Sequence, residues 1–519
     1  MAAATLPLFP ADSTPAEPTV NFSQACFAFR LLQTWLSSAE TTSLSENQVE
    51  EQLQVRGREL LRLLLQAHLR QRGSGDVGPA LLVLTGPPAD ATPDDALTAE
   101  PNSVRHAEKR SHDCTLHTVL GEVTLERTAY AAAGQLSVHP LDEQLHLPKR
   151  SFSYPLQKRL VRHAVQGPFD ESISNVAQDT GVQVSKRSAE QIVQEAAVDF
   201  QAFYPQHPTG ELPHSGPIVV TGIDCKGVPM IKPEQTLRKV RRGKGDKKHK
   251  KRMAMVATVR TQQTRVRTPR EVVESLFRTT PKEKTPRVRR KAPVPKEHKR
   301  VWANLLQSKD EVIAEVVEEV KRVDPTGSKT HVAICDGERA LQKRILPALA
   351  AVVPTVLLIL DLLHVVAKLW QASHCFHAEG SDEARQWVQK QTLRILQGEV
   401  RYVIKGLRQS ATVRDLRGQK RETVEKIAKY LHRNRKYMKY DEYLRQGLPI
   451  ASGCVEGACK NLIKDRMERS GMRWSLEGAE AMIRLRSLYL SGDLDDYWDF
   501  HLQQEHRRLY PPGRWHVVQ

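Results

Sequence analysis

The stretch IVVTGIDCKGVPM, residues 218–230, begins with apolar, β-branched residues and then reaches a carboxylate at Asp224. The apolar run is typical of a buried strand, where a carboxylate is costly unless it is paired or binds a cation. Two later apolar runs end in the same way, HVAICDG at Asp336 and TVLLILD at Asp361. One such Asp can be an ordinary turn residue at a strand end, but three in one chain indicate a cluster with a function.

The segment around these runs predicts an α/β fold. Strands are expected at IVVTGID, at GVPMI and at MAMVATVR (253–260), followed by a long amphipathic helix over 298–323 and by the strands that end at Asp336 and Asp361. This order favours a mixed five-stranded sheet with flanking helices. Functional groups collect at strand ends in such sheets, so Asp224 and Asp336 are expected side by side if their strands are neighbours.

A third carboxylate, Glu456, lies at the start of a helix predicted in GCVEGACK. Three converging carboxylates repel one another, and a divalent cation removes that cost. Hard oxygen ligands favour Mg²⁺ or Mn²⁺, and two such ions about 4 Å apart can promote phosphoryl transfer. Asp224 would then bridge two ions, Asp336 would hold one of them and Glu456 the other.

The positive charge of the chain is concentrated in two places. The formal net charge is +18 over 519 residues, and most of the excess comes from residues 238–252 and 281–300, which carry ten and nine Lys or Arg respectively. Such runs suggest a polyanion partner, with nucleic acid as the leading candidate. The alternative is a pair of solvated loops without a specific partner. The length predicts about two to four domains.

Cysteine usage and hydropathy indicate a soluble chain of the cytoplasm. The seven cysteines form no CxxC pair, which predicts no disulfide framework and a reducing compartment. HCFH at 374–377 lacks a second half for a zinc site. The N-terminus has no signal-peptide pattern, and ALAAVVPTVLLIL (348–360) is interrupted by a proline, so it predicts a helix end plus a strand.

The N-terminal part predicts helices, a hairpin and a helix-turn-helix. Helical periodicity covers 22–36 and 46–72, and TLHTVLGEVTLERTAY alternates around a glycine as a β-hairpin does. Within 169–200, one helix precedes a turn at Gly181, and a second helix begins after Ser185 with Lys186 and Arg187. A DNA-binding helix-turn-helix has this layout, although many αα-hairpins share it.

The chain resembles the DDE transposases of bacterial insertion sequences, specifically the Kra-four family, which is related to the Mutator-like transposases. The resemblance covers roughly residues 110–500 and rests on GIDCKGVPM, CDG (335–337), DLLH (361–364), GEVTLERTAY, PLDEQLHLP and above all GCVEGACKNLIKDRMERSGMRWSLEGAEAMIRLRSL (453–488). It implies a catalytic core of the ribonuclease H type, with Asp224, Asp336 and Glu456 as the catalytic, metal-binding triad.

The resemblance also implies a domain plan. We expect a helical or disordered N-terminal region over 1–110, a hairpin and helix-turn-helix-like DNA-binding region over 111–205, and the first part of the core over 216–364. A helical insertion over 365–450 and the end of the core over 451–519 would follow. Relatives often carry paired cysteines around the N-terminal hairpin, but here only Cys114 remains, so no structural zinc is predicted.

Asp361 and His364 match a D-x-x-H element of the wider group and lie one helical turn apart. A direct catalytic role and a role in bracing the site both remain open for this pair.

Four basic or aromatic residues after Glu456 are candidates for DNA contacts. An α-helix would place Lys460 and Lys464 on the face of Glu456, near the scissile phosphate, unless they only form a solvated face. Arg473 and Trp474 could hold or stack on a DNA end, unless the Trp ring is buried.

The predicted function is that of a transposase. It would bind the terminal inverted repeats of its element as a homodimer or higher oligomer on double-stranded DNA. It would then use two Mg²⁺ or Mn²⁺ ions to cleave a strand and join the freed 3′-hydroxyl to target DNA, in association with the nucleoid. The alternatives are a ribonuclease H-like nuclease without strand transfer, and a catalytically inactive DNA-binding or regulatory derivative.

Overall fold

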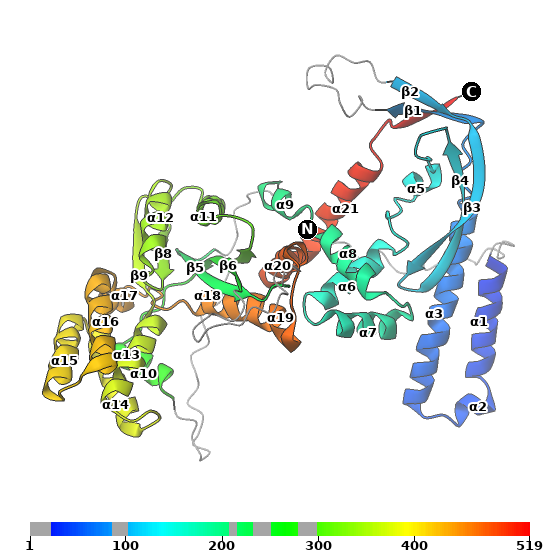
Figure 1. Cartoon of the computed structure of the whole chain (residues 1–519). Coiled ribbons are helices and arrows are strands. Elements are labelled where there is room, and N and C mark those ends of the chain that lie inside the picture. The colour runs from blue at the N-terminus through cyan, green and yellow to red at the C-terminus, as the bar shows by residue number, and fades with distance from the viewer. Residues whose placement is uncertain (1–21, 86–101, 207–214, 232–250, 279–297, 519) are drawn as a thin grey trace, which may run out of the picture. The chain divides into compact units, whose positions relative to one another are not determined.

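The computed structural model describes residues 22–85, 102–206, 215–231, 251–278 and 298–518 (Figure 1). Residues 1–21 and nearly all of the two basic runs lie outside these ranges. The described chain divides into two compact units, residues 1–192 with 498–519, and residues 193–497. Within the described residues, no helix is both long enough and apolar enough to cross a membrane.

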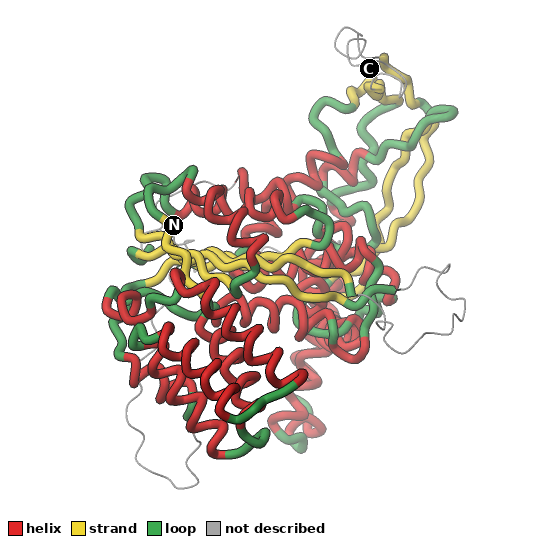
Figure 2. The backbone as a smooth tube through the Cα atoms, turned by 60° about the vertical axis from the view of Figure 1, so that its left-hand side comes forward, coloured by secondary structure: helices red, strands yellow, loops and turns green. Residues whose placement is uncertain are grey.

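A mixed five-stranded sheet forms the centre of the unit 193–497. Its order is β7-β6-β5-β8-β9. Strand β6 is antiparallel to both of its neighbours, β5 and β7, whereas β8 and β9 are parallel to the central strand β5. Helices lie on both faces of the strands, which Figure 2 shows in yellow. The strands are β5 (Ile218–Val228), β6 (Arg252–Gln262), β7 (Lys299–Asn304), β8 (Thr330–Cys335) and β9 (Val356–Leu360).

The mixed sheet with flanking helices is confirmed, but two of the expected elements are wrong. GVPMI does not form a second strand, because β5 continues through Gly227 and Val228 in one ladder with β6. The helix expected over 298–323 is a strand, β7, followed by α11 (Lys309–Val323). Ser308 caps α11 in a reciprocal capping box with Glu311, which starts the helix eleven residues later than the apolar periodicity suggested.

The apolar faces of the helices explain how they cover the sheet. In α11, Val312, Val316 and Val320 recur at helical spacing and are fully buried, as expected for the core-facing stripe of an amphipathic helix. Further helices of this unit are α9 (Phe200–Gln206), α10 (Pro269–Leu276), α12 (Arg339–Ala350), α13 (Leu362–Phe376), α18 (Gly453–Ala458), α19 (Asp465–Met467) and α20 (Leu476–Ser491).

The segment predicted as a helical insertion is helical and shares one apolar core with the sheet. Its helices are α14 (Asp382–Leu396), α15 (Val400–Val413), α16 (Gly418–Asn434) and α17 (Tyr440–Arg445). Ile334 and Ile359 of the sheet belong to the same buried cluster as Leu396, Leu407 and Ile427 of these helices. These helices are therefore packed against β8 and β9, the last two strands of the sheet.

The unit that begins the chain contains more β-structure than the sequence predicted. The expected hairpin is present as β3 and β4, paired from Glu108 to Ala131, and a three-stranded sheet of β1, β2 and β10 is additional. The elements are α1 (Ser23–Leu36), α2 (Ala39–Thr42), α3 (Glu46–Gln71), β1 (Ala80–Thr85), β2 (Asn102–His106), β3 (Glu108–Thr118), β4 (Gly121–Ala131), α5 (Pro140–Gln144), α6 (Tyr154–Ala164) and β10 (Trp515–Val518). Helix α21 (Leu494–Leu509) leads into β10.

The helices of the expected helix-turn-helix are α7 (Phe169–Thr180) and α8 (Lys186–Ala196). Gly181 ends α7 with φ +74°, a left-handed conformation that favours glycine. The Ser185 hydroxyl accepts a hydrogen bond from the Ser188 N–H at 3.1 Å, so it caps α8 as expected. Lys186 and Arg187 are exposed, and Lys186 forms only a surface ion pair with Asp170 at 3.2 Å.

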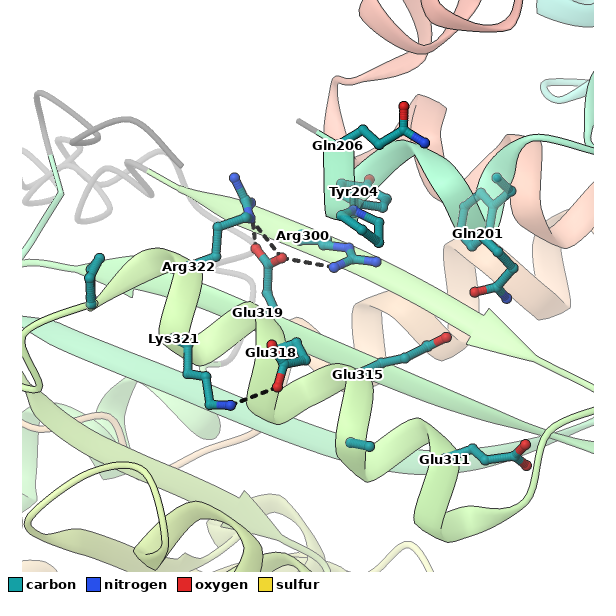
Figure 3. Close-up of a pocket in the computed structure, with 14 residues that line it drawn as sticks. Gln201, Tyr204, Gln206, Arg300, Glu311, Glu315, Glu318, Glu319, Lys321 and Arg322 are labelled. Atoms are coloured by element: carbon teal, nitrogen blue, oxygen red, sulfur yellow. Dashed lines mark hydrogen bonds and ion pairs between the residues drawn. The ribbon is translucent and has the colours of Figure 1, made fainter. Parts of the chain in front are cut away.

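A cavity of about 680 Å³ lies beside β7, α9 and α11, and a buried charge cluster forms part of its wall (Figure 3). The Glu319 carboxylate pairs with His298, Arg300 and Arg322 at 2.6–2.8 Å and has no exposed side-chain surface. Burial alone would raise the pKa of Glu319, but its hydrogen bond with His298 and the charges of Arg300 and Arg322 hold that pKa far below its usual range.

We expect Glu319→Gln to lower the free energy of unfolding at neutral pH by about 3–5 kcal/mol, because it leaves buried cations without a counter-charge. A depressed carboxyl pKa stabilises the fold above the ordinary Glu pKa of about 4.3 and loses that effect as the pH falls. The difference from wild type should therefore shrink below about pH 4. Thermal unfolding at pH 7 and pH 3 measures it. Glu318→Gln is the exposed control, expected within about 0.5 kcal/mol of wild type at both pH values.

Candidate active site

Strand register aligns the three aspartates of the sequence motifs in one row. Gly222 of β5 is in register with Ile334 of β8, which is in register with Ile359 of β9. Two residues after each of these positions, the backbone reaches Asp224, Asp336 and Asp361 respectively. Residues two apart point to the same face of a strand, and neighbouring strands lie about 4.8 Å apart. The aspartates therefore lie at one edge of the sheet, two of them directly after the ends of β8 and β9.

Asp224 and Asp336 line the same small cavity, which has a volume of about 220 Å³. The Asp224 carboxylate accepts a hydrogen bond from the Cys225 N–H at 2.6 Å and from the Cys459 thiol at 3.5 Å. The Asp336 carboxylate accepts one from the Glu338 N–H at 2.7 Å. Two carboxylates thus face one cavity with mostly weak or backbone donors around them.

Asp361 differs from these two because its carboxylate is buried and fully engaged. One oxygen accepts hydrogen bonds from the N–H groups of Leu363 at 3.1 Å and Ser452 at 3.0 Å. The other accepts from His364 Nδ1 at 2.8 Å and from the Ser452 hydroxyl. Burial alone would raise the pKa of Asp361, but the hydrogen bonds from His364 and Ser452 hold that pKa below its usual range.

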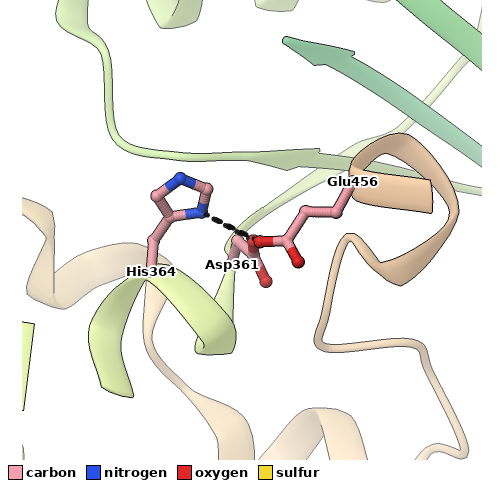
Figure 4. A group of neighbouring side chains, drawn as sticks. All are labelled: Asp361, His364 and Glu456. Carbon is pink, nitrogen blue, oxygen red and sulfur yellow. Dashed lines mark hydrogen bonds and ion pairs between the residues drawn. The ribbon is translucent and has the colours of Figure 1, made fainter. Parts of the chain in front are cut away.

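Glu456 reaches the same edge of the sheet from α18. Gly222 of β5 permits this close approach, because a Cβ at that position would lie only 2.9 Å from the Val455 side chain. Ligand atoms of Asp361, His364 and Glu456 all lie within 4.8 Å of one another (Figure 4). Within the described residues the Glu456 carboxylate accepts no hydrogen bond, and His364 Nδ1 lies 4.0 Å from its Oε1.

The electrostatics of the site are those of crowded carboxylates. Burial and the negative charges of Asp361 and Asp224 raise the pKa of Glu456. The hydrogen bond to Asp361 raises the pKa of His364, and the negative charges of Asp336 and Glu456 act in the same direction. The negative charges of the carboxylates therefore repel one another at this edge of the sheet, and His364 relieves part of that repulsion at Glu456.

The grouping differs in one respect from the predicted triad. The three ligand groups that approach within 4.8 Å are Asp361, His364 and Glu456, whereas Asp224, Asp336 and Glu456 do not all meet at that distance. Asp361 already accepts four hydrogen bonds, and these leave it little capacity for a metal. The geometry therefore favours the bracing role that the sequence had left open for this residue.

The donor set fits a hard divalent cation. Asp224, Asp336 and Glu456 supply carboxylate oxygens with unused acceptor capacity, and oxygen ligands are those that Mg²⁺ and Mn²⁺ prefer. The two nearby thiols, Cys225 and Cys459, have pKa values raised by burial, so they remain protonated and are weak ligands for such ions.

Contacts from α16 hold the loop that carries Asp336. The Tyr430 hydroxyl of α16 donates a hydrogen bond to the Asp336 carbonyl at 2.7 Å. Gly337 follows with φ +91°, and a Cβ there would lie 2.9 Å from the Tyr430 ring. Sequence reasoning missed Tyr430, Ser452 and Cys459, because each contacts a residue at least 90 positions away. For the contact with Tyr430, the only local sequence signal was Gly337, the glycine in CDG.

The basic residues after Glu456 are only partly placed as expected. Residues 459–464 form a π-helix, whose wider turn ends the α-helical spacing that was expected to align Lys460 and Lys464 with Glu456. Both lysines and Arg473 are exposed. Trp474 is buried and donates a hydrogen bond to the Met467 carbonyl at 3.0 Å, so its ring packs inside the protein, which was the alternative to stacking on DNA.

Comparison with known proteins gives a match to a family model and matches to solved structures. A model of an uncharacterised protein family (UPF0236) matches residues 93–209, less than half of the chain. The structure of the Drosophila P element transposase strand transfer complex matches with a TM-score of 0.25 and 11% sequence identity, over 69% of this chain and 82% of that chain. No curated protein matches the sequence significantly.

Removal of the Ser452 hydroxyl should destabilise this edge of the sheet. We expect Ser452→Ala to lower the free energy of unfolding by about 1.5–3 kcal/mol, since the lost hydrogen bond is to a buried charged carboxylate. The matched control is Ser487→Ala, whose buried hydroxyl bonds only to the Ile483 carbonyl of its own helix at 2.7 Å and should cost about 0.5–1.5 kcal/mol. Equal losses of unfolding free energy in a denaturant titration would contradict the view that Ser452 stabilises the buried charge of Asp361.

Proposed function

We propose that this chain is a DDE transposase with a core of the ribonuclease H type, as the motif resemblance implies. The observation that supports it best is the alignment of Asp224, Asp336 and Asp361 at one edge of the sheet with Glu456 facing them. The sheet itself, with three antiparallel strands followed by two parallel ones, is compatible with such a core.

In this proposal Asp224, Asp336 and Glu456 hold two Mg²⁺ or Mn²⁺ ions beside the scissile phosphate. When bound, the ions would supply the activation of the attacking oxygen and the stabilisation of the leaving oxygen. The raised pKa of Glu456 and the shared cavity of Asp224 and Asp336 support this role, since a cation relieves both the repulsion and the burial cost.

Asp361 and His364 have different roles in the proposed site. Asp361 is a positioning residue, because it ties the end of β9 to Ser452, the residue that precedes the Glu456 helix. His364 is half-buried, and its raised pKa favours the imidazolium form. The imidazolium of His364 could therefore bind a phosphate oxygen of the DNA strand.

The remaining basic groups would bind DNA. Lys186 and Arg187 lie at the start of the second helix of the helix-turn-helix, which is the end of the helix that contacts base edges in that motif. Lys460, Lys464 and Arg473 are exposed on the segments that follow Glu456 and would neutralise phosphates near the cleaved bond. The partner proposed for these groups is the terminal inverted repeat of the element.

Cleavage of an element end tests the catalytic proposal directly. We expect the wild-type chain to cut a labelled duplex that carries the inverted repeat when Mg²⁺ is present, and Asp224→Asn to lower the rate at least about 100-fold, as loss of a metal ligand or its support does. Duplex binding should be unchanged. Asp382→Asn, an exposed first-turn residue of α14, is the matched control and should cut normally.

The alternative functions, a nuclease without strand transfer and an inactive DNA-binding regulator, predict different products. Joining of the cut end to a target plasmid supports transposition, whereas cleavage without joining favours a nuclease of the same fold. If the wild type binds the duplex but cuts it with neither Mg²⁺ nor Mn²⁺, the catalytic proposal fails and a DNA-binding regulator becomes the better assignment.

A further inference from the structure

The small cavity of the candidate site contains an ammonium group as well as carboxylates. The charged residues of its wall are Asp224, Asp336, Glu338 and Lys309. Among the described residues that line this cavity, Lys309 alone carries a positive charge, and it lies outside every motif on which the family resemblance rests. Its Nζ pairs with Glu338 Oε1 at 3.0 Å. A cation beside two proposed metal ligands therefore needs a physical explanation.

Lys309 occupies a position at which a helix usually carries an acidic residue. It is the first residue of α11, whose start is fixed by the capping box between Ser308 and Glu311. The next two residues, Asp310 and Glu311, are acidic, as the positive end of the helix dipole favours, whereas a lysine is unfavourable there. A residue that goes against such a local preference is expected mainly at a functional site.

A purely structural ion pair explains Lys309 poorly. The side chains of Lys309 and Glu338 are 37% and 43% exposed, and exposed pairs contribute little to stability. Helices α11 and α12 are also linked by Arg344, which donates two hydrogen bonds to the Asp310 carboxylate at 2.8 and 2.9 Å. In the described part of the chain, Lys309 is the one partner of the Glu338 carboxylate. The pair can therefore open at small cost.

We propose that Lys309 is a further catalytic residue of this site, whose ammonium group holds a non-bridging phosphate oxygen of the DNA strand beside Asp224 and Asp336. The inference rests on the proposed function. Without DNA, the Glu338 carboxylate takes the place of that oxygen, and the phosphate displaces it. A lysine suits this task because its ammonium is a compact point charge that binds phosphate. The positive end of the α11 dipole attracts the phosphate as well.

Lys309 and Glu338 have opposite effects on DNA binding in this proposal. Loss of the Lys309 charge removes a phosphate contact, whereas loss of the Glu338 charge removes the group that competes for that contact. If the pair only joined α11 to α12, the two variants would remove the same interaction and would change DNA binding alike. The direction of the two effects therefore distinguishes a phosphate contact from a structural ion pair.

Binding of a labelled duplex that carries the element's end tests the contact without cleavage. The dissociation constant is measured between about 50 and 200 mM KCl with Ca²⁺ present, since this ion takes oxygen ligands and compensates the carboxylates. We expect Lys309→Met to weaken binding and to reduce the slope of log affinity against log salt by about 0.9, the value for one phosphate contact. Glu338→Gln should bind at least about twofold more tightly than wild type.

Two variants are the matched controls. Lys321→Met removes the charge of another α11 lysine, which pairs with Glu318 at 2.8 Å, and it should leave the salt slope unchanged. Asp310→Asn removes the exposed carboxylate that follows Lys309, and it should not tighten binding as Glu338→Gln does. A wild-type slope in Lys309→Met, or an equal gain in Asp310→Asn and Glu338→Gln, would overturn the proposal.

Cleavage at saturating duplex separates this inference from the proposed function. With Mg²⁺ we expect Lys309→Met to cut at least about tenfold more slowly than wild type, and Lys309→Arg to recover part of the rate because it keeps the charge. If the wild type and Lys309→Met cut equally fast, Lys309 has no catalytic role and the proposed function stands. If the wild type cuts with neither Mg²⁺ nor Mn²⁺, the proposed function fails and the catalytic role of Lys309 with it, whereas the salt slope still decides the phosphate contact.

Discussion

The buried carboxylate of Asp361 is the constraint on which the geometry of the site depends. It has no exposed surface and accepts four hydrogen bonds, two of them from Ser452, a residue 91 positions later in the chain. The Leu362 N–H also donates to the Ile450 carbonyl at 3.0 Å. The end of β9, the start of α13 and the approach to the Glu456 helix are thereby fixed as one piece, which a water-exposed carboxylate could not achieve.

Hydrogen bonding divides the four carboxylates of the site into two kinds. Asp361 is ionised and satisfied by its donors, so its negative charge becomes a fixed part of the fold. Asp224, Asp336 and Glu456 accept far fewer hydrogen bonds. Burial and the negative charges of Asp361 and Asp224 raise the pKa of Glu456. A rigidly held anion, Asp361, therefore lies beside three carboxylates that have few hydrogen-bond donors. Such an arrangement is typical of functional sites. It costs stability unless a cation binds.

Helices α16 and α17 contribute to this arrangement as well as packing against the sheet. Tyr430 of α16 holds the loop of Asp336, and the Tyr440 hydroxyl of α17 donates to the Leu360 carbonyl at 2.7 Å, one residue before Asp361. Both hydroxyls are attached to helices that share an apolar core with β8 and β9. Movement of the insertion would therefore reach the aspartates through short, direct contacts, without a need for a long chain of intermediates.

The sequence by itself determined the local features. Apolar runs that end on Asp224, Asp336 and Asp361 predicted the strand ends, and Gly181 with Ser185 predicted the boundary between α7 and α8, because these signals lie within a few residues of what they specify. It could not separate β7 from α11, since the apolar spacing of 298–323 suits a helix throughout. Only the tertiary structure decided the register that aligns the aspartates, the clamp between Asp361 and Ser452, the burial of Trp474 and the π-helical turn after Glu456. Each of these depends on contacts between distant segments, whose free energy overrides local preference.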